Sequence, residues 1–140
     1  MKNKGAGFYL TILTVLAAAA ALVCYIWNCR TDYFASYGIS KGVIGCMADG
    51  ILVEILVLGT GKGEPKIWKD ILPVAGAVLL MAAGIQFIGL RINEAAFIMT
   101  FQKNASNVAD LESAIAGTIC CLVASILGMC AAFFDVKEAA

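Results

Sequence analysis

The sequence predicts an all-α protein, a four-helix transmembrane bundle, and three observations support this prediction. Four apolar blocks are each long enough to cross a bilayer, because about 20 helical residues span a hydrocarbon core of about 30 Å. The hydrophobic fraction of the 140-residue chain is 61% and its charged fraction 14%, against roughly 45–50% and 25% in soluble domains. Most charged residues lie between or beyond the four blocks. We therefore expect one multi-pass domain in the cell membrane, with the lipid bilayer as its first partner.

The first block continues through five alanines, Ala17 to Ala21, as far as Trp27. This run is too long for the apolar region of a secretory signal peptide, so we expect it to remain as a span. Pro73 lies in the predicted first turn of the third span, where its missing N–H costs little. The membrane domain covers residues 1–140, with spans at about 7–28, 42–60, 71–92 and 112–134.

Two connections, 29–41 and 93–111, share the side of the membrane opposite the termini. The half-apolar stretch 95–101 is too short to span, and we expect it to extend the third helix or to lie along the interface. Asp110 is the predicted N-cap of the last helix. The aromatic residues of the first connection, Tyr33, Phe34 and Tyr37, suit an interfacial anchor, or alternatively a docking surface for a partner.

The distribution of basic residues predicts that both termini are cytoplasmic (N-in/C-in) and that the two connections are extracellular. Six of the ten basic residues lie on the side of the termini, and cytoplasmic segments carry an excess of lysine and arginine. The six are Lys2, Lys4, Lys62, Lys66, Lys69 and Lys137, and the other four are Arg30, Lys41, Arg91 and Lys103.

The second span contains two acids, Asp49 and Glu54. A carboxylate at the bilayer centre costs about 2.5–3.5 kcal/mol on insertion scales, so each should face protein or water, or be protonated. Five residues at about 100° each place the two side chains about 140° apart on the helix. The span therefore needs two protected sides, one facing its own bundle and the other a neighbouring subunit or an aqueous path. This is the main argument for a homo-oligomer.

The depth of each residue in its span suggests polar partners for the acids. Counting about 1.5 Å per residue, Asp49 lies near the depth of Gln86 or Thr118, and Glu54 near that of Ser125 or Thr14. These six residues are the candidate polar path or intramembrane site. Three interpretations remain open: a path for cations, protons or a polar solute, a structural role in fixing helix register, or recognition of a partner subunit.

Small residues in the last span predict close helix packing. They form two ridges at a spacing of four residues, which suggests that this helix packs on more than one side. One ridge is Gly117, Cys121 and Ser125, and the other is Ala124, Gly128 and Ala132.

The composition argues against several kinds of chemistry. The chain has six cysteines but no histidine and no CxxC motif, so neither a metal site nor a redox motif is predicted, and the cysteines suit small apolar fillers. A thiol oxidase is the enzyme alternative, but no nucleophile–base pair or cofactor motif supports it. Ten basic and ten acidic residues cancel, which argues against nucleic-acid binding. We expect no catalytic residues, no enzyme activity and no cofactor.

Two segments, TDYFASYGIS in the first connection and SNVADLESAIAG leading into the last helix, resemble small four-span membrane proteins of Gram-positive bacteria. The resemblance implies a bacterial membrane setting and supplies no activity. Small multidrug transporters also have four spans and an embedded glutamate, but theirs lies in the first span, which here has no acid. We therefore expect a homo-oligomeric pore-like or transport-related assembly. The alternative is an accessory or scaffold subunit that binds a second membrane protein.

Overall fold

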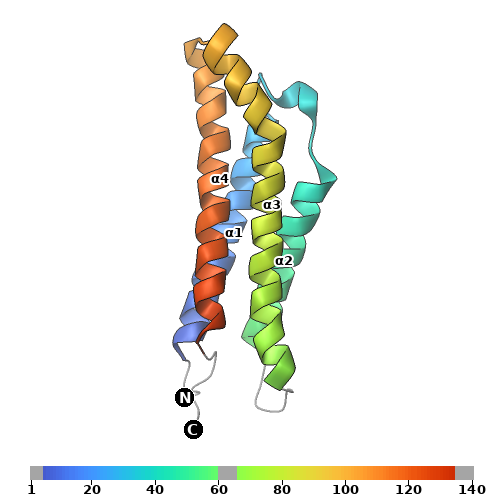
Figure 1. Cartoon of the computed structure of the whole chain (residues 1–140), viewed down its shortest axis with the longest axis vertical. Helices are drawn as coiled ribbons and strands as arrows, with labels where there is room; N and C mark the ends of the chain where they lie inside the picture. Colours follow the sequence, from blue (N-terminus) through green and yellow to red (C-terminus); the bar gives the residue numbers. More distant parts are fainter. Residues whose placement is uncertain (1–4, 60–65, 135–140) are drawn as a thin grey trace.

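A computed structural model describes residues 5–59 and 66–134, and this part of the chain is helical with no strand (Figure 1). Four α-helices are long and apolar enough to cross a membrane. The all-α fold of four membrane-spanning helices is therefore confirmed. The helices are α1 (Ala6–Cys29), α2 (Lys41–Gly59), α3 (Lys66–Phe101) and α4 (Ala105–Ala132), with a short 3-10 helix, η1 (Ala35–Tyr37), between α1 and α2.

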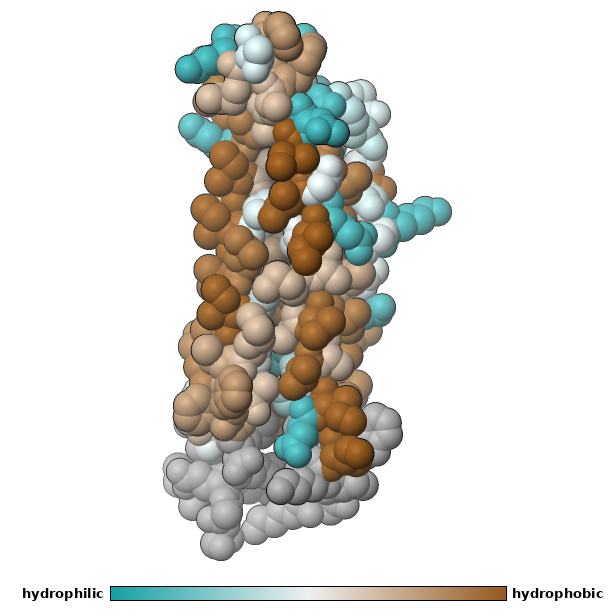
Figure 2. Space-filling model, viewed as in Figure 1, coloured by the Kyte–Doolittle hydropathy of each residue, from teal (hydrophilic) through white to brown (hydrophobic). Residues whose placement is uncertain are grey.

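The helices pack side by side in a ring. The main contacts join α1 to α4, α4 to α3, α3 to α2 and α2 to α1, so that α2 and α4 lie diagonally across the bundle. In Figure 1, α1 begins and α4 ends at the lower end, and η1 and the turn between α3 and α4 lie at the upper end. On the face seen in Figure 2, apolar side chains run along most of the bundle, and hydrophilic ones gather mainly toward the upper end. Such an apolar surface suits contact with lipid.

Which end faces the cytoplasm remains a prediction. Four of the six lysines on the predicted cytoplasmic side lie outside the described residues, and so do the side chains of Lys66 and Lys69.

The bounds of α1 and α2 lie close to the predicted spans, but α3 and α4 are longer than predicted. Helix α3 begins at Lys66 and runs on to Phe101, so the stretch 95–101 extends it. Pro73 consequently lies inside α3, and its expected place in the first turn was wrong. The proline nitrogen carries no hydrogen, so Pro73 cannot donate the backbone hydrogen bond that a residue inside a helix normally donates.

The N-cap of α4 also differs from the prediction. The helix begins at Ala105, and the Asn104 side chain accepts a hydrogen bond of 2.8 Å from the Asn107 N–H. Asparagine is among the strongest N-caps because its side-chain oxygen satisfies an otherwise free donor. The prediction for Asp110 was wrong, since this residue lies within the helix and its carboxylate binds the first connection.

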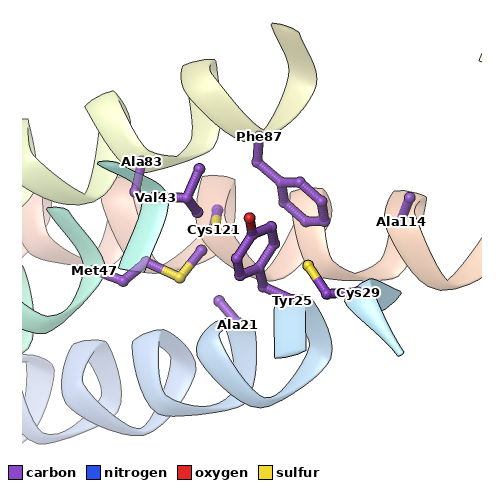
Figure 3. Packing of buried hydrophobic residues seen from close by; sticks show 9 residues of the cluster. All are labelled: Ala21, Tyr25, Cys29, Val43, Met47, Ala83, Phe87, Ala114 and Cys121. Atoms are coloured by element: carbon purple, nitrogen blue, oxygen red, sulfur yellow. The ribbon is translucent and has the colours of Figure 1, made fainter. Parts of the chain in front are cut away.

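The core lies in the upper half of the bundle and takes side chains from all four helices (Figure 3). Tyr25 of α1 and Phe87 of α3 meet edge to face at its centre, with ring centroids 4.8 Å apart. The Tyr25 hydroxyl accepts a hydrogen bond of 2.8 Å from the Ser40 N–H, which ties the start of α2 to the core. A second, smaller cluster of Ala18, Leu80 and Ala124 lies further down. These contacts fix the helices that surround the polar residues described next.

Candidate functional site

The Glu54 side chain lies inside the single-chain bundle, and 0% of its surface is exposed. Neither carboxyl oxygen has a hydrogen-bond partner in the described part of the chain. Most buried polar groups in proteins are paired, and an unpaired one needs a physical explanation. Because an isolated carboxylate is far costlier to bury than a neutral acid, the packing suits the protonated form of Glu54.

Two glycines, one on α3 and one on α4, leave room for this carboxyl group. A Cβ atom added to Gly76 of α3 would collide with Glu54 Oε1 and would lie 2.9 Å from its Cδ. A Cβ added to Gly128 of α4 would lie 3.4 Å from Glu54 Oε1 and 3.4 Å from Thr14 Cγ2 of α1. The Glu54 side chain thus reaches the region where all four helices meet. We call this region, formed by Thr14, Glu54, Gly76 and Gly128, the Glu54 site.

The two hydroxyl groups predicted to pair with Glu54 donate their hydrogen bonds elsewhere. Thr14 Oγ1 donates to the Leu10 carbonyl at 2.9 Å, and Ser125 Oγ donates to the Cys121 carbonyl at 2.8 Å. Both residues are fully buried. Thr14 lies beside Glu54 as the depth argument suggested, but the expected hydrogen bond is absent from the described structure. The Glu54 carboxyl therefore has Thr14 beside it but no hydrogen-bond donor in the described structure.

Asp49 lies on the outer side of α2 and is exposed in the single bundle. The two acids of α2 thus lie on different sides of the helix, as their spacing predicts. Gln86 of α3 is also exposed, and its Nε2 donates to Cys46 Sγ, one turn from Asp49, at 3.4 Å. No hydrogen bond joins Asp49 to Gln86 in the described structure. We call Cys46, Asp49 and Gln86 the outer polar face.

Thr118 does not join this face, so its suggested pairing with Asp49 was wrong. It lies on α4, diagonally across the ring from α2, and donates to the Ala114 carbonyl at 2.9 Å. A depth estimate ranks residues along the membrane normal and carries no information about which helices are neighbours.

The small residues predicted to pack α4 lie on its inner side. Gly117, Cys121, Ala124 and Gly128 are buried and Ala132 is half-buried. A Cβ on Gly117 would lie 2.7 Å from the Phe87 ring of α3 and 3.4 Å from Cys24 Cβ of α1. Close approach on two sides is what the paired ridges predict.

A polar network at the upper end was not predicted from the sequence. Arg91 of α3 is 6% exposed, and its Nε donates to Asn28 Oδ1 of α1 at 2.9 Å. Asn28 Nδ2 donates in turn to Ser113 Oγ of α4 at 2.8 Å. The Arg91 guanidinium also lies 4.5 Å from the centre of the Phe34 ring. The available signal was one arginine inside a predicted span, since intramembrane charges often mark a site.

The first connection folds over the same end. The Tyr33 N–H donates to Asp110 Oδ2 and its hydroxyl donates to Glu94 Oε2, both at 3.0 Å. Phe34 is fully buried and packs with Ile98, so its expected role as an interfacial anchor was wrong. Partial burial and the hydrogen bond to Glu94 raise the pKa of Tyr33 to about 12. These contacts hold the connection against α3 and α4.

Comparison with known proteins adds no assignment, since no protein-family model, curated protein or solved structure matches the chain. Among the described residues, no group of three or more cysteine, aspartate or glutamate side chains could hold a metal ion. All six cysteines are free. The Glu54 site is therefore the strongest candidate on its own geometry, and the resemblance to small Gram-positive membrane proteins rests on the two sequence segments alone.

Proposed function

We propose that the protein is a non-enzymatic, transport-related membrane protein in which Glu54 takes up and releases a proton. The observation that carries this proposal is the fully buried Glu54 carboxyl, which has no hydrogen-bond partner at the meeting point of four membrane-spanning helices. Intramembrane carboxyl groups that face a bundle interior recur in proton relays and ion paths. A purely structural acid would be expected to hold a fixed partner, and Glu54 holds none in the described structure.

The surroundings of Glu54 fit a group that changes protonation state. Thr14 lies beside the carboxyl, next to Gly128, and its hydroxyl is bonded only to its own helix. Hydroxyl groups can rotate and both donate and accept, so they can serve a neutral acid or a carboxylate. We propose that release of the proton requires water to reach the carboxyl through a shift of the helices that Gly76 and Gly128 allow to approach closely. The path would thus run within each bundle.

We further propose that the protein assembles as a homo-oligomer through the outer polar face, with both termini cytoplasmic. Asp49 is exposed in the middle of α2, and a carboxyl facing acyl chains is costly. Gln86, on the neighbouring helix, supplies an amide donor. A two-fold contact would let Asp49 of each copy meet Gln86 of the other, because an isologous interface places the same patch on both sides.

The test is proton flux into liposomes that contain the purified protein and an internal pH-sensitive dye, driven by a potassium diffusion potential. We expect the wild-type protein to acidify the liposomes and the Glu54→Gln variant to match protein-free liposomes. Glutamine keeps the size of the side chain but cannot release a proton. The control is Glu112→Gln, which removes an exposed carboxyl near the start of α4 and should leave the flux unchanged. Equal flux in wild type and Glu54→Gln would contradict the proposal.

A second function is favoured by the same outer polar face. An accessory or scaffold subunit would use Asp49 and Gln86 to bind a different membrane protein, since polar groups that face lipid need a partner. This alternative predicts no flux from the purified chain. It also predicts that a second membrane protein co-purifies in fixed ratio with the wild type and is lost in Asp49→Leu.

A further inference from the structure

Glu54 lies closer to one end of the bundle than to the other. At 1.5 Å per residue it is about 8 Å from the end of α2 at Gly59 and about 20 Å from its start at Lys41. The nearer end is the lower one in Figure 1, where α1 begins and α4 ends. A proton that leaves Glu54 therefore has a short route to the end of the chain termini and a long route to the opposite end.

On the short route, the buried face of α1 carries two hydroxyl groups. Thr14 lies beside the Glu54 carboxyl, and Thr11, which is 1% exposed, lies one turn nearer the lower end. The Thr11 hydroxyl donates to the Gly7 carbonyl at 2.7 Å, so its oxygen can still accept a hydrogen bond. These two residues form a buried polar strip below Glu54.

Helix α3 adds a second polar group on this side. Pro73 is buried and lies one turn nearer the lower end than Gly76, which packs on Glu54. Because proline has no N–H, the backbone carbonyl of residue 69 loses its usual helical donor and can accept from water. A buried water molecule needs two to four such polar partners. Helices α1 and α3 therefore both offer acceptors to water below Glu54.

The long route crosses apolar layers. Leu80 Cδ2 lies 3.0 Å from the Cβ that an alanine would have at Gly50, one turn above Glu54. Further up, the rings of Tyr25 and Phe87 meet at the centre of the larger core cluster (Figure 3). These side chains fill the interior between Glu54 and the upper end.

The polar groups on the long route do not form a continuous strip. Ser125 follows Ala124, which packs with Ala18, and the Tyr25 hydroxyl lies about 10 Å above Ala18 along α1. Beyond them the route meets Arg91, which is buried in the interior at the upper end. A fixed positive charge raises the energy of a proton or another cation in its path.

No charged group acts on Glu54 within the described structure. From α1, α3 and α4 its side chain meets Thr14, Gly76 and Gly128, and none of these titrates. The protonation state of Glu54 therefore depends on the pH of the compartment whose water reaches it.

Resting on the proton uptake proposed above, we propose that Glu54 exchanges its proton with the compartment on the side of the chain termini. Water held by Thr11, Thr14 and the carbonyl that Pro73 leaves without a donor carries the proton. In this conformation the opposite side is closed by the apolar layers and by Arg91.

The test is carbodiimide labelling of Glu54 in proteoliposomes whose inner and outer pH are set separately. Dicyclohexylcarbodiimide crosses membranes and reacts with protonated carboxyl groups, so the labelled fraction reports the pH that reaches Glu54. A protease added outside removes an N-terminal tag only from molecules whose termini face outward. The intact mass of each molecule then gives its orientation and its label together, and Glu54→Gln gives the background.

We expect labelling to fall as the pH rises on the side of the termini, and to be insensitive to the pH on the opposite side. Labelling that follows the pH of the opposite side, or of both sides equally, would overturn the proposal. Labelling that is absent at every pH would overturn it as well.

A second measurement tests the polar strip. Thr11→Val should slow the Glu54-dependent proton flux about fivefold, the rate equivalent of one neutral hydrogen bond, and Thr11→Ser should keep the wild-type rate. The matched control is Thr118→Val, which removes a hydroxyl with the same kind of bond, 2.9 Å to the carbonyl four residues earlier, and should leave the flux unchanged. Wild-type flux in a folded Thr11→Val, or an equal loss in Thr118→Val, would count against the strip. If Thr11→Val does not fold, the labelling decides.

The two readouts separate this proposal from the function proposed above. Equal flux in wild type and Glu54→Gln would contradict the function, and labelling would still show which side reaches Glu54. Glu54-dependent flux combined with labelling that follows the opposite side would leave the function standing and overturn the route.

Discussion

A carboxyl group without a hydrogen-bond partner can be buried only where its neighbours leave space for it. Around Glu54 that space comes from two missing side chains, at Gly76 and Gly128. Glycine weakens a helix by up to about 1 kcal/mol relative to alanine, so its presence in mid-span calls for a packing reason. At Gly76 the reason is the Glu54 carboxyl, which occupies the volume that a methyl group would need.

Gly76→Ala should therefore destabilise the bundle by about 1–3 kcal/mol, the usual cost of overpacking a core. The measurement is thermal unfolding in detergent micelles, followed by circular dichroism. Gly89→Ala is the matched control on the same helix, since nothing lies within 4 Å of its added Cβ, and it should be neutral or slightly stabilising.

The same contact can be isolated by a double-mutant cycle. In a Glu54→Ala background the carboxyl group is gone, so adding Gly76→Ala should lower the free energy of unfolding only slightly. The coupling free energy between the two positions should therefore equal most of the loss caused by Gly76→Ala alone. Additive effects would show that Gly76 does not make room for Glu54.

At this scale, the sequence indicated which residues are unusual but not how they are arranged. The spacing of Asp49 and Glu54 predicted two different sides of α2, because helix geometry alone determines that angle. It could not predict which acid faces inward. That outcome depends on which helices are neighbours, and the same missing information led to the wrong pairing of Asp49 with Thr118.

The element that the sequence predicted least well is α3. Apolar length marked only the part that crosses the bilayer, and the helix continues at both ends. Beyond the membrane its course depends on tertiary contacts, such as Ile98 packing on Phe34. The first connection folds over this extension because Tyr33 reaches Glu94 and Asp110. An aromatic-rich loop gives no sign of such contacts in its composition, which is equally typical of an interfacial anchor.

The contact between Tyr33 of the first connection and Glu94 of α3 predicts that the stability of the fold depends on pH. Partial burial and the Glu94 hydrogen bond raise the pKa of Tyr33 to about 12, from an ordinary value of about 10. The folded state therefore holds this proton more tightly than the unfolded state. Its contribution to stability is fully present below about pH 10 and is lost as the pH rises toward 12.

The pKa can be measured from phenolate absorbance at high pH, as the difference between wild type and Tyr33→Phe. We expect Glu94→Gln to lower the pKa of Tyr33, because the glutamine does not repel the phenolate. Glu112→Gln, an exposed acid elsewhere on the upper end, should leave it unchanged. A Tyr33 pKa that does not respond to Glu94→Gln would show that the hydrogen bond is not a cause.

On the scale of the whole molecule, the bundle separates two polar regions. The Glu54 site is enclosed by four helices of one chain, and the outer polar face lies on the surface of α2 and α3. The sequence predicted the four spans and the need for two protected sides, because both follow from helix geometry and the cost of charge in lipid. A single chain protects only one of these sides. In the homo-oligomer that we propose, a second copy covers the other side.

The proposed association leads to a prediction about oligomeric state. In lipid nanodiscs the wild-type protein should exceed the 14.7 kDa of one chain, because association covers the mid-span Asp49. Asp49→Leu removes the costly group and its interhelical hydrogen bond, so this variant should shift toward single bundles. Mass photometry or stepwise photobleaching gives the number of chains per disc. Glu112→Leu, which removes an exposed acid outside the outer polar face, should keep the wild-type number. A wild type that remains a single bundle at all protein-to-lipid ratios would refute the association, because Asp49 would then face acyl chains uncovered.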